Sequence, residues 1–199
     1  MSLVDRAKNI VISPKTEWDV VAQEEPNMGN IITGYVIPLA LIPTIATLLR
    51  WSIIGHFGFT FGIAQAVIQL LMAVLGVYIT AFVVNALATS FQSQQNLGRA
   101  TQLIAYAYTP AWIAGILNII PGIAAILTSL IMLAASIYGL YLLYLGTPVM
   151  MGTPKDKVVI YLIVTIIILV VVYVILAFAL AAIIFPIFGV SMLNTLSTY

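Results

Sequence analysis

The sequence predicts an all-α integral membrane protein with five transmembrane helices, preceded by short amphipathic, interfacial helices at the N-terminus. Of its 199 residues, 63% are hydrophobic and only 7% are charged, whereas soluble domains carry about 25% charged residues. No Lys, Arg, Asp or Glu occurs in residues 51–98, 100–154 or 158–199. A membrane span needs about 20 apolar residues, so each of these stretches can hold one or two spans. The apolar stretches are continuous rather than alternating, which excludes a transmembrane β-barrel.

Residues 1–29 are expected to form two short helices at the membrane interface, on the cytoplasmic side. The spacing of five apolar residues places them on one face of the first helix. These residues are Leu3, Val4, Ala7, Ile10 and Val11. Ser13 followed by Pro14 indicates the start of a second helix, with Ser13 as its cap, ending near Glu24. Trp18 on its apolar side is expected to anchor this helix at the interface.

Residues 30–199 are expected to form one transmembrane domain. Its five spans are predicted at about 31–53, 61–90, 100–118, 122–145 and 158–185. Pro38 and Pro43 predict a kink or break in the first span. Spans three and four are expected to form a tight hairpin that turns at Pro121-Gly122, and two Gly-Thr-Pro triplets within residues 146–154 predict the next loop. The fifth span, rich in Ile and Val, is expected to face lipid.

The distribution of cations predicts the orientation of these spans. With the N-terminus inside, six of the seven Lys and Arg residues lie in inner segments and only Arg50 lies in an outer one. The inner cations are Arg6, Lys8, Lys15, Arg99, Lys155 and Lys157. Positive charge is enriched on the cytoplasmic side of membrane proteins, so the N-terminus is expected inside and the C-terminus outside.

Polar residues in the second span lie on two nearly opposite faces. Gln65 and Gln69 belong to the face in its outer half, and Asn85 to the face in its inner half. Either these side chains make hydrogen bonds between helices, or they line a polar pathway. Measured hydrogen bonds of this kind in membranes average only about 0.6 kcal/mol, so they need not be functional.

The stretch around the third span supplies the remaining candidate packing or pathway residues. Arg99 begins this span, where a cation opposes the helix dipole, and it is interpreted as a topological anchor or a contact for lipid phosphate or a protein partner. Tyr106 and Pro110 interrupt the apolar segment, and Asn118 ends it.

Small residues at helical spacing predict how the spans pack, because they let helices in lipid approach closely. The fourth span carries such a stripe at Gly122, Ala125, Ser129, Ser136 and Gly139. The third carries Ala107, Ala111, Gly115 and Asn118. Both stripes are expected to face the bundle, with spans two, three and four as its core.

Several function classes lack the residues they need. The chain has no cysteine and one histidine, and no arrangement of catalytic side chains is evident, so neither an enzyme nor a cofactor site is expected. No ionisable residue lies in the middle of a span, which disfavours a proton-coupled transporter. A net charge of +1 gives no basic patch, so the expected partner is the lipid bilayer and not nucleic acid.

Three segments in order resemble the Yip family of membrane proteins, named for interaction with Ypt/Rab GTPases. They are NIVISPKTEWDVVAQEEP before the first span, FQSQQNLGRATQLIAYAYTPAW entering the third, and LYLLYLGTPVMMGTPKDKVVIYLIV joining the last two. The resemblance implies five spans with an inside N-terminus. Eukaryotic members are linked to vesicle trafficking and membrane shaping, with long cytosolic tails; the short N-terminal segment here resembles prokaryotic members of the plasma membrane.

Two functions are therefore weighed. The first is a non-enzymatic protein that organises the membrane by associating with itself or with another membrane protein. The alternative is a transporter or channel for a small neutral or lipid-like solute, because broken helices such as the one expected at Pro38 and Pro43 line transporter sites. Its pathway would use the space between spans one, two and three.

Overall fold

A computed structural model describes residues 1–54, 58–120 and 124–175. Within these ranges all regular structure is helical, as the sequence predicts. Residues 1–162 and 163–199 form two separate units. Four described helices are long and apolar enough to cross a membrane: Met28–Ile54, Phe59–Phe91, Ile126–Met151 and Val158–Ile175. The expected turn at Pro121-Gly122 and residues 176–185 of the predicted fifth span lie outside the described residues.

The two predicted N-terminal helices are present as α1 (Leu3–Ile12) and α2 (Pro14–Ala22). Ser2 caps α1 by accepting a hydrogen bond from the Asp5 amide at 3.1 Å. The prediction that Ser13 caps α2 through its side chain is wrong, since that side chain makes no capping bond. Its carbonyl instead accepts from the amide that begins the α2 ladder, at Glu17.

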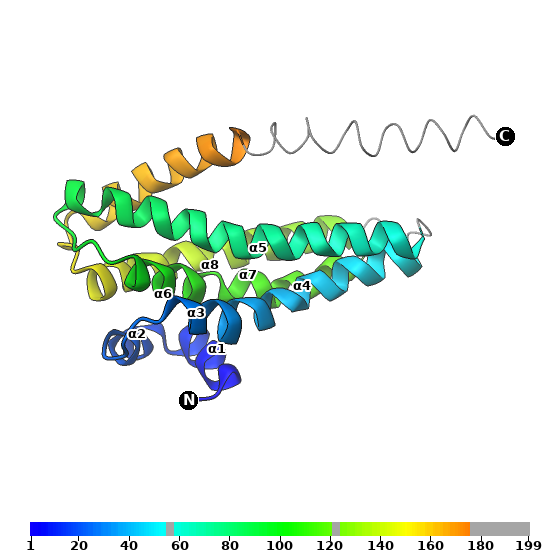
Figure 1. The fold of residues 1–199 in the computed structure, drawn as a ribbon, viewed down its shortest axis with the longest axis horizontal. Coiled ribbons are helices and arrows are strands. Elements are labelled where there is room, and N and C mark those ends of the chain that lie inside the picture. The colour runs from blue at the N-terminus through cyan, green and yellow to red at the C-terminus, as the bar shows by residue number, and fades with distance from the viewer. Residues whose placement is uncertain (55–57, 121–123, 176–199) are drawn as a thin grey trace. The chain divides into compact units, whose positions relative to one another are not determined.

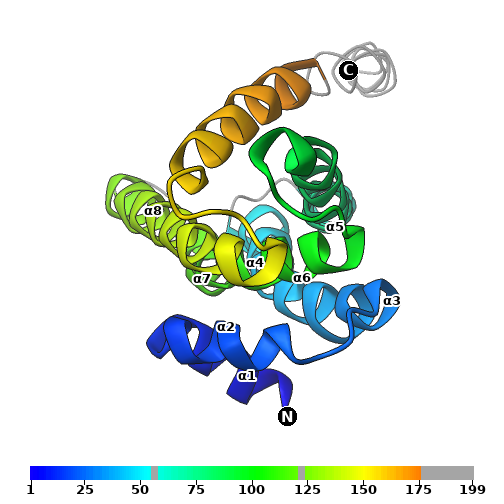
Figure 2. The same ribbon diagram turned by 90° about the vertical axis from the view of Figure 1, so that its left-hand side faces the viewer.

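These helices pack against the bundle and form a layer along one side of it (Figures 1 and 2). Ala7 and Ile10 of α1 and Trp18 and Val21 of α2 are buried. Trp18 is fully buried against α8, with its ring over Gly146. The expectation that Trp18 anchors the chain at the membrane interface is therefore wrong, because its indole fills a gap in the protein core.

The first span is one helix, Met28–Ile54, whose hydrogen-bonding pattern changes before Pro38 but not at Pro43. It consists of α3 (Met28–Ile31), a π-helical segment (Ile32–Val36), α4 (Ile37–Leu49) and a second π-helical segment (Arg50–Ile54). The first π-helical segment ends two residues before Pro38, whose missing amide cannot continue the α-helical ladder. Pro43 stays inside α4.

The second span is α5 (Phe59–Leu87), which continues into a 3-10 turn (Ala88–Phe91). Gln92 then adopts a left-handed conformation with φ of 57° and ends the helix. The following loop pairs with the end of α8. The Gln94 amide donates to the Met151 carbonyl at 2.8 Å, and the Ser93 and Thr153 hydroxyls are 2.7 Å apart.

The third predicted span is divided into three helical segments. They are α6 (Leu97–Ala107), α7 (Thr109–Ala114) and a 3-10 segment (Gly115–Ile119). The division falls at Tyr108, two residues before Pro110, because Pro110 has no amide to donate to the preceding turn. All residues from 100 to 107 are buried, so α6 is the central helix of the described bundle.

The fourth span is α8 (Ala124–Met151), and it is longer than predicted. Gly146-Thr-Pro148 was expected in a loop but lies within this helix, where burial of Met150, Met151 and Thr147 holds the last turns against the protein. The loop is confined to residues 152–157, and the helix Val158–Ile175 follows.

The predicted packing of the small-residue stripes is only partly correct. In the fourth span, Gly122 and the Ala125 side chain lie outside the described residues, Ser129 and Ser136 are exposed, and Gly139 approaches the Ala107 carbonyl. In the third span, Gly115 does face the bundle, where it packs on Pro43. The core also includes the first span, which was not expected, through Val36, Leu39 and Ala40 of that helix.

A buried polar cluster as candidate functional site

A buried ion-pair network joins the two N-terminal helices at the site. The Arg6 side chain is 7% exposed and its Nη1 atom lies 2.5 Å from Oε1 of Glu17, whose side chain is 6% exposed. The other guanidinium nitrogen pairs with Glu24, which is partly exposed, just after α2. Arg6 faces inward because it lies four residues before the buried Ile10, on the same side of α1. The network therefore holds α1, α2 and the segment that follows α2 together.

Aromatic side chains continue this cluster into the bundle. The Arg6 guanidinium carbon lies 5.5 Å from the ring centroid of Tyr106, a cation–π contact. Tyr106 also meets Tyr35 edge to face, with 4.6 Å between centroids and an interplanar angle of 89°. The Tyr35 hydroxyl lies 2.7 Å from that of Thr109 at the start of α7. Polar contacts thus extend from the N-terminal helices to the break in the third span.

A cavity of about 290 Å³ adjoins this cluster. Its polar lining comes from α1 and its cap, the segment between α2 and α3, α3 itself, the first π-helical segment and α6. The polar residues are Ser2, Arg6, Glu24, Glu25, Asn27, Asn30, Tyr35, Gln102 and Tyr106. Gln102 is only 2% exposed, and its Oε1 atom has no hydrogen-bond partner. A buried acceptor of this kind is costly when unpaired, so it is the atom of the site most in need of a donor.

Tyr106 is the one predicted candidate residue that lines this cavity, and Arg99 lies close by in the fold. The Arg99 Nη1 atom donates to the Val21 carbonyl at 3.1 Å, in the last turn of α2. Asn96 caps α6 by accepting from the Arg99 amide at 3.0 Å. The unfavourable position of this cation at the start of α6 is therefore offset, because its side chain reaches the C-terminal end of another helix.

The other candidate residues lie elsewhere. Gln65, Gln69 and Asn85 are half-buried in α5, and the Asn85 Oδ1 atom has no hydrogen-bond partner. Pro110 is buried in the first turn of α7. Asn118 lies at the opposite end of the third span from Arg99, where its carbonyl accepts from Arg50 Nη1 at 3.4 Å. The structure does not bring these residues together into one site.

Five residues of the cluster were missed from the sequence: Arg6, Glu17, Glu24, Tyr35 and Gln102. Two signals could have found part of the set. Arg6 shares a helix face with the apolar Ile10, and Gln102 shares one with Tyr106, in each case at a spacing of four residues. The pairing of Arg6 with Glu17 depends on the turn between α1 and α2, which no spacing within either helix reveals.

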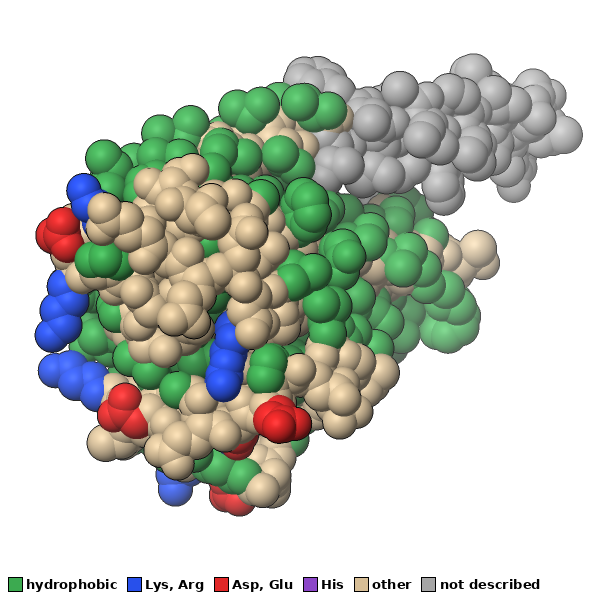
Figure 3. Space-filling model, turned by 60° about the vertical axis from the view of Figure 1, so that its left-hand side comes forward, with side chains coloured by type: hydrophobic (Ala, Val, Ile, Leu, Met, Phe, Trp, Pro, Cys, Tyr) green, Lys and Arg blue, Asp and Glu red, His purple; other side chains and the backbone are tan. Residues whose placement is uncertain are grey.

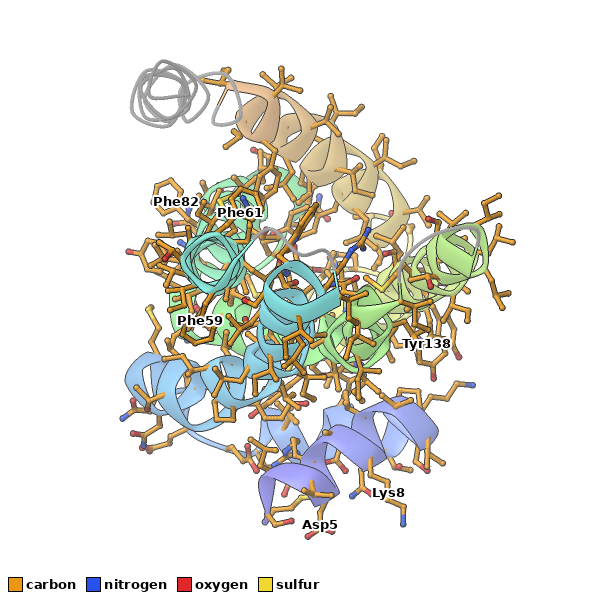
Figure 4. All side chains as sticks on the ribbon, turned by 90° about the vertical axis from the view of Figure 1, so that its right-hand side faces the viewer. Asp5, Lys8, Phe59, Phe61, Phe82 and Tyr138 are labelled. Atoms are coloured by element: carbon orange, nitrogen blue, oxygen red, sulfur yellow. The ribbon has the colours of Figure 1, made fainter. Side chains whose placement is uncertain are left out.

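Charged side chains gather at this end of the molecule, and apolar surface covers much of the rest of the same face (Figure 3). Asp5 and Lys8 lie on the outer side of α1, away from the cluster (Figure 4). Among the described residues, no group of three or more His, Cys, Asp or Glu side chains could hold a metal ion. The arrangement can bind polar groups, and it offers no nucleophile activated by a neighbouring base.

Comparison with known proteins identifies a family and two relatives. A family model described as the Yip1 domain matches residues 8–179. The inner membrane protein YohC of Escherichia coli, from strains K12 and O6:H1, is 28% identical over 154 residues, which covers 72% of this chain and 77% of YohC. No solved structure matches.

Proposed function

Because the chain belongs to the Yip1 domain family, we propose that this multi-pass membrane protein is not an enzyme and organises a prokaryotic inner membrane by associating with copies of itself. The name of the relative YohC supports the location. The observation that supports self-association is a groove beside α8, where small side chains line a surface that faces away from the core.

The groove is a cavity of about 410 Å³ between α7 and the middle of α8. Its lining is mostly apolar: Ala107, Tyr108, Ala111, Leu133, Ala135, Ser136, Ile137, Gly139, Leu140 and Leu143. Gly139 brings α8 against the Ala107 carbonyl, where an added Cβ would lie only 2.9 Å from that oxygen. The Ser136 hydroxyl is satisfied within α8, since it donates to the Met132 carbonyl at 2.9 Å. The groove therefore suits a helix that packs by close contact, as small residues allow in lipid.

Cysteine cross-linking tests this proposal directly, because the natural chain has no cysteine. Ser136→Cys places one thiol in the groove, and Phe82→Cys places one on the outward face of α5, where Phe82 is 56% exposed. In native membranes we expect oxidation to give a disulfide-linked dimer of Ser136→Cys and little dimer of Phe82→Cys. Equal cross-linking of the two variants, or none of either, contradicts self-association through the groove.

Buried apolar side chains occupy part of the space that a transport pathway would use. Val36, Val77 and Ile104, from the first three spans, are fully buried there. Hydrogen bonds join the same spans, with 3.0 Å between the Thr80 and Tyr108 hydroxyls. Neither of the two cavities described above is lined by the polar candidates of α5. These observations favour packing over transport as the role of the polar faces.

We also propose five spans, with the N-terminus in the cytoplasm and the C-terminus outside. Residues 97–119 would be the additional crossing, despite their break at Tyr108. Their first turn contacts α2 through Arg99, and their last contacts the far end of the first span through Arg50. They therefore extend along the bundle as far as the first span does.

A further inference from the structure

We propose that the cavity beneath α1 is a binding site for an ammonium group, as carried by an ethanolamine phospholipid or a free small amine. Four features of the cavity support this assignment: its charge, its unpaired acceptor, its aromatic wall and its size. The inference stands whether or not the chain associates with itself.

The charge of the cavity favours a cation. Its lining holds two cations, the Arg6 guanidinium and the α-amino group of Met1, and both of the paired Arg6 nitrogens are already committed to Glu17 and Glu24. Glu25 adds a third carboxylate at the rim of the cavity. Asp5 and Lys8 lie on the outer side of α1 (Figure 4). Glu24 and Glu25 line the cavity and Glu17 lies beside Arg6, so three carboxylates face two cations and the cluster carries one excess negative charge. A phosphate or carboxylate ligand would meet this negative charge, so an anion is disfavoured.

The unpaired acceptor calls for a hydrogen-bond donor. Gln102 is 2% exposed and lines the cavity, and its Oε1 atom has no partner in the protein. An ammonium group carries several N–H donors and no acceptor, so it can satisfy this oxygen and a rim carboxylate together. Bonds of this charged kind are stronger than those between neutral groups.

The aromatic wall adds a second means of recognising positive charge. Tyr35 and Tyr106 meet at an interplanar angle of 89° and both line the cavity. The faces of aromatic rings attract cations, and two rings at right angles present such faces in two directions. Tyr106 already holds one cation in this way, the Arg6 guanidinium.

The size and position of the cavity favour a small headgroup. Its volume of about 290 Å³ is at the lower end of the range for ligand pockets, about 300–1,000 Å³. Its lining joins the N-terminal helices to the beginning of the first span. This is the end where charged residues gather, and hence the level at which lipid headgroups are expected.

Native mass spectrometry of the full chain, with a purification tag at the C-terminus so that the cavity is unchanged, tests the proposal. The protein is released from nanodiscs that contain equal amounts of phosphatidylethanolamine and phosphatidylglycerol. We expect the wild type to retain one phosphatidylethanolamine in preference to phosphatidylglycerol. Free ethanolamine added as a competitor distinguishes the two sources, since displacement shows that the amine alone is sufficient, and persistence of the adduct shows that the site needs the lipid.

Variants connect retention to the cavity. Gln102→Leu removes the acceptor without leaving a buried polar atom, so it should fold, and it should weaken ethanolamine-lipid retention about ten-fold. Glu25→Gln at the exposed rim should weaken it about three-fold. Gln69→Leu, a half-buried glutamine of α5 outside the cavity, is the matched control and should retain the lipid as the wild type does. Equal retention of both lipids, a preference for phosphatidylglycerol, or unchanged retention in Gln102→Leu would overturn the proposal.

Discussion

At the scale of single residues, Arg6 determines how the N-terminal helices are held. It is a charged residue in a buried position, and its stability there depends on Glu17 and Glu24. The two carboxylates are not equivalent. The Glu17 side chain is 6% exposed and depends on Arg6, whereas that of Glu24 is 41% exposed and can be hydrated without it. Removal of Arg6 and removal of Glu17 should therefore have different effects.

We predict that Arg6→Met destabilises the protein by about 3–5 kcal/mol, because it leaves the Glu17 carboxylate buried without a partner. Glu17→Leu should cost less, since Arg6 keeps its pair with Glu24. The double variant should recover much of the loss of Arg6→Met, because it buries no unpaired charge. Thermal unfolding of the detergent-solubilised variants measures all three, and Lys8→Met on the exposed face of α1 is the control. Additive losses in the double variant would show that the pair is not coupled.

At the scale of elements, apolar runs and proline positions were sufficient to predict α1, α2, α5 and the first span, with a change of helix type before Pro38 in place of a break. Each of these depends on a pattern within one segment. Contacts between distant segments explain the errors. Gly146 was expected in a loop because Gly, Thr and Pro favour turns, but Trp18 packs on it and the helix continues. The same contact buries Trp18, which no pattern within α2 could distinguish from an interfacial position.

The candidate site was also predicted only in part, because some of its residues depend on contacts between distant segments. Tyr106 was selected because it interrupts an apolar segment, and the structure places it in the cluster. Gln102, one turn earlier in the same helix, was overlooked, since a single glutamine in a span is ordinary. Its importance depends on the cavity, whose lining combines residues from 1–35 with Gln102 and Tyr106. The last two lie more than 60 positions further along the chain.

We predict that Gly146→Ala loosens α2 from α8. An added Cβ would lie 2.6 Å from both the Trp18 ring and a Leu103 methyl carbon, too close for either to remain in place. Overpacking of this kind costs about 1–3 kcal/mol. Here it should weaken the packing of α2 against α8. Hydrogen exchange measured by mass spectrometry should become faster in residues 14–22 and stay unchanged in α5.

The matched control for this change is Gly34→Ala, because a Cβ at Gly34 meets nothing within 4 Å. It should leave exchange in α2 at the wild-type rate. Equal protection of α2 in Gly146→Ala and the wild type would mean that the indole does not hold α2 in place.

At the scale of the whole molecule, the order of loops along the described bundle favours an even number of crossings up to residue 152. The loop before α6 and the loop after α8 touch, through the Gln94 amide and the Met151 carbonyl at 2.8 Å. Both therefore belong to one side of the membrane. If α8 alone crossed between them they would lie on opposite sides, whereas the proposed crossing of residues 97–119 brings both loops to the same side.

Single cysteines in the cysteine-free chain test this topology without altering any cation. Gln95→Cys and Asp156→Cys, before α6 and after α8, are exposed, as is Phe59→Cys at the start of α5. With a maleimide that cannot cross the membrane, we expect intact spheroplasts to label Phe59→Cys only, and permeabilised ones to label all three. If residues 97–119 did not cross, α8 would carry Asp156→Cys to the outside, where it would react together with Phe59→Cys while Gln95→Cys stayed protected. The reactivity of position 156 relative to position 95 therefore distinguishes five spans from four. With five spans both positions lie on the inner side, whereas with four spans they lie on opposite sides of the membrane.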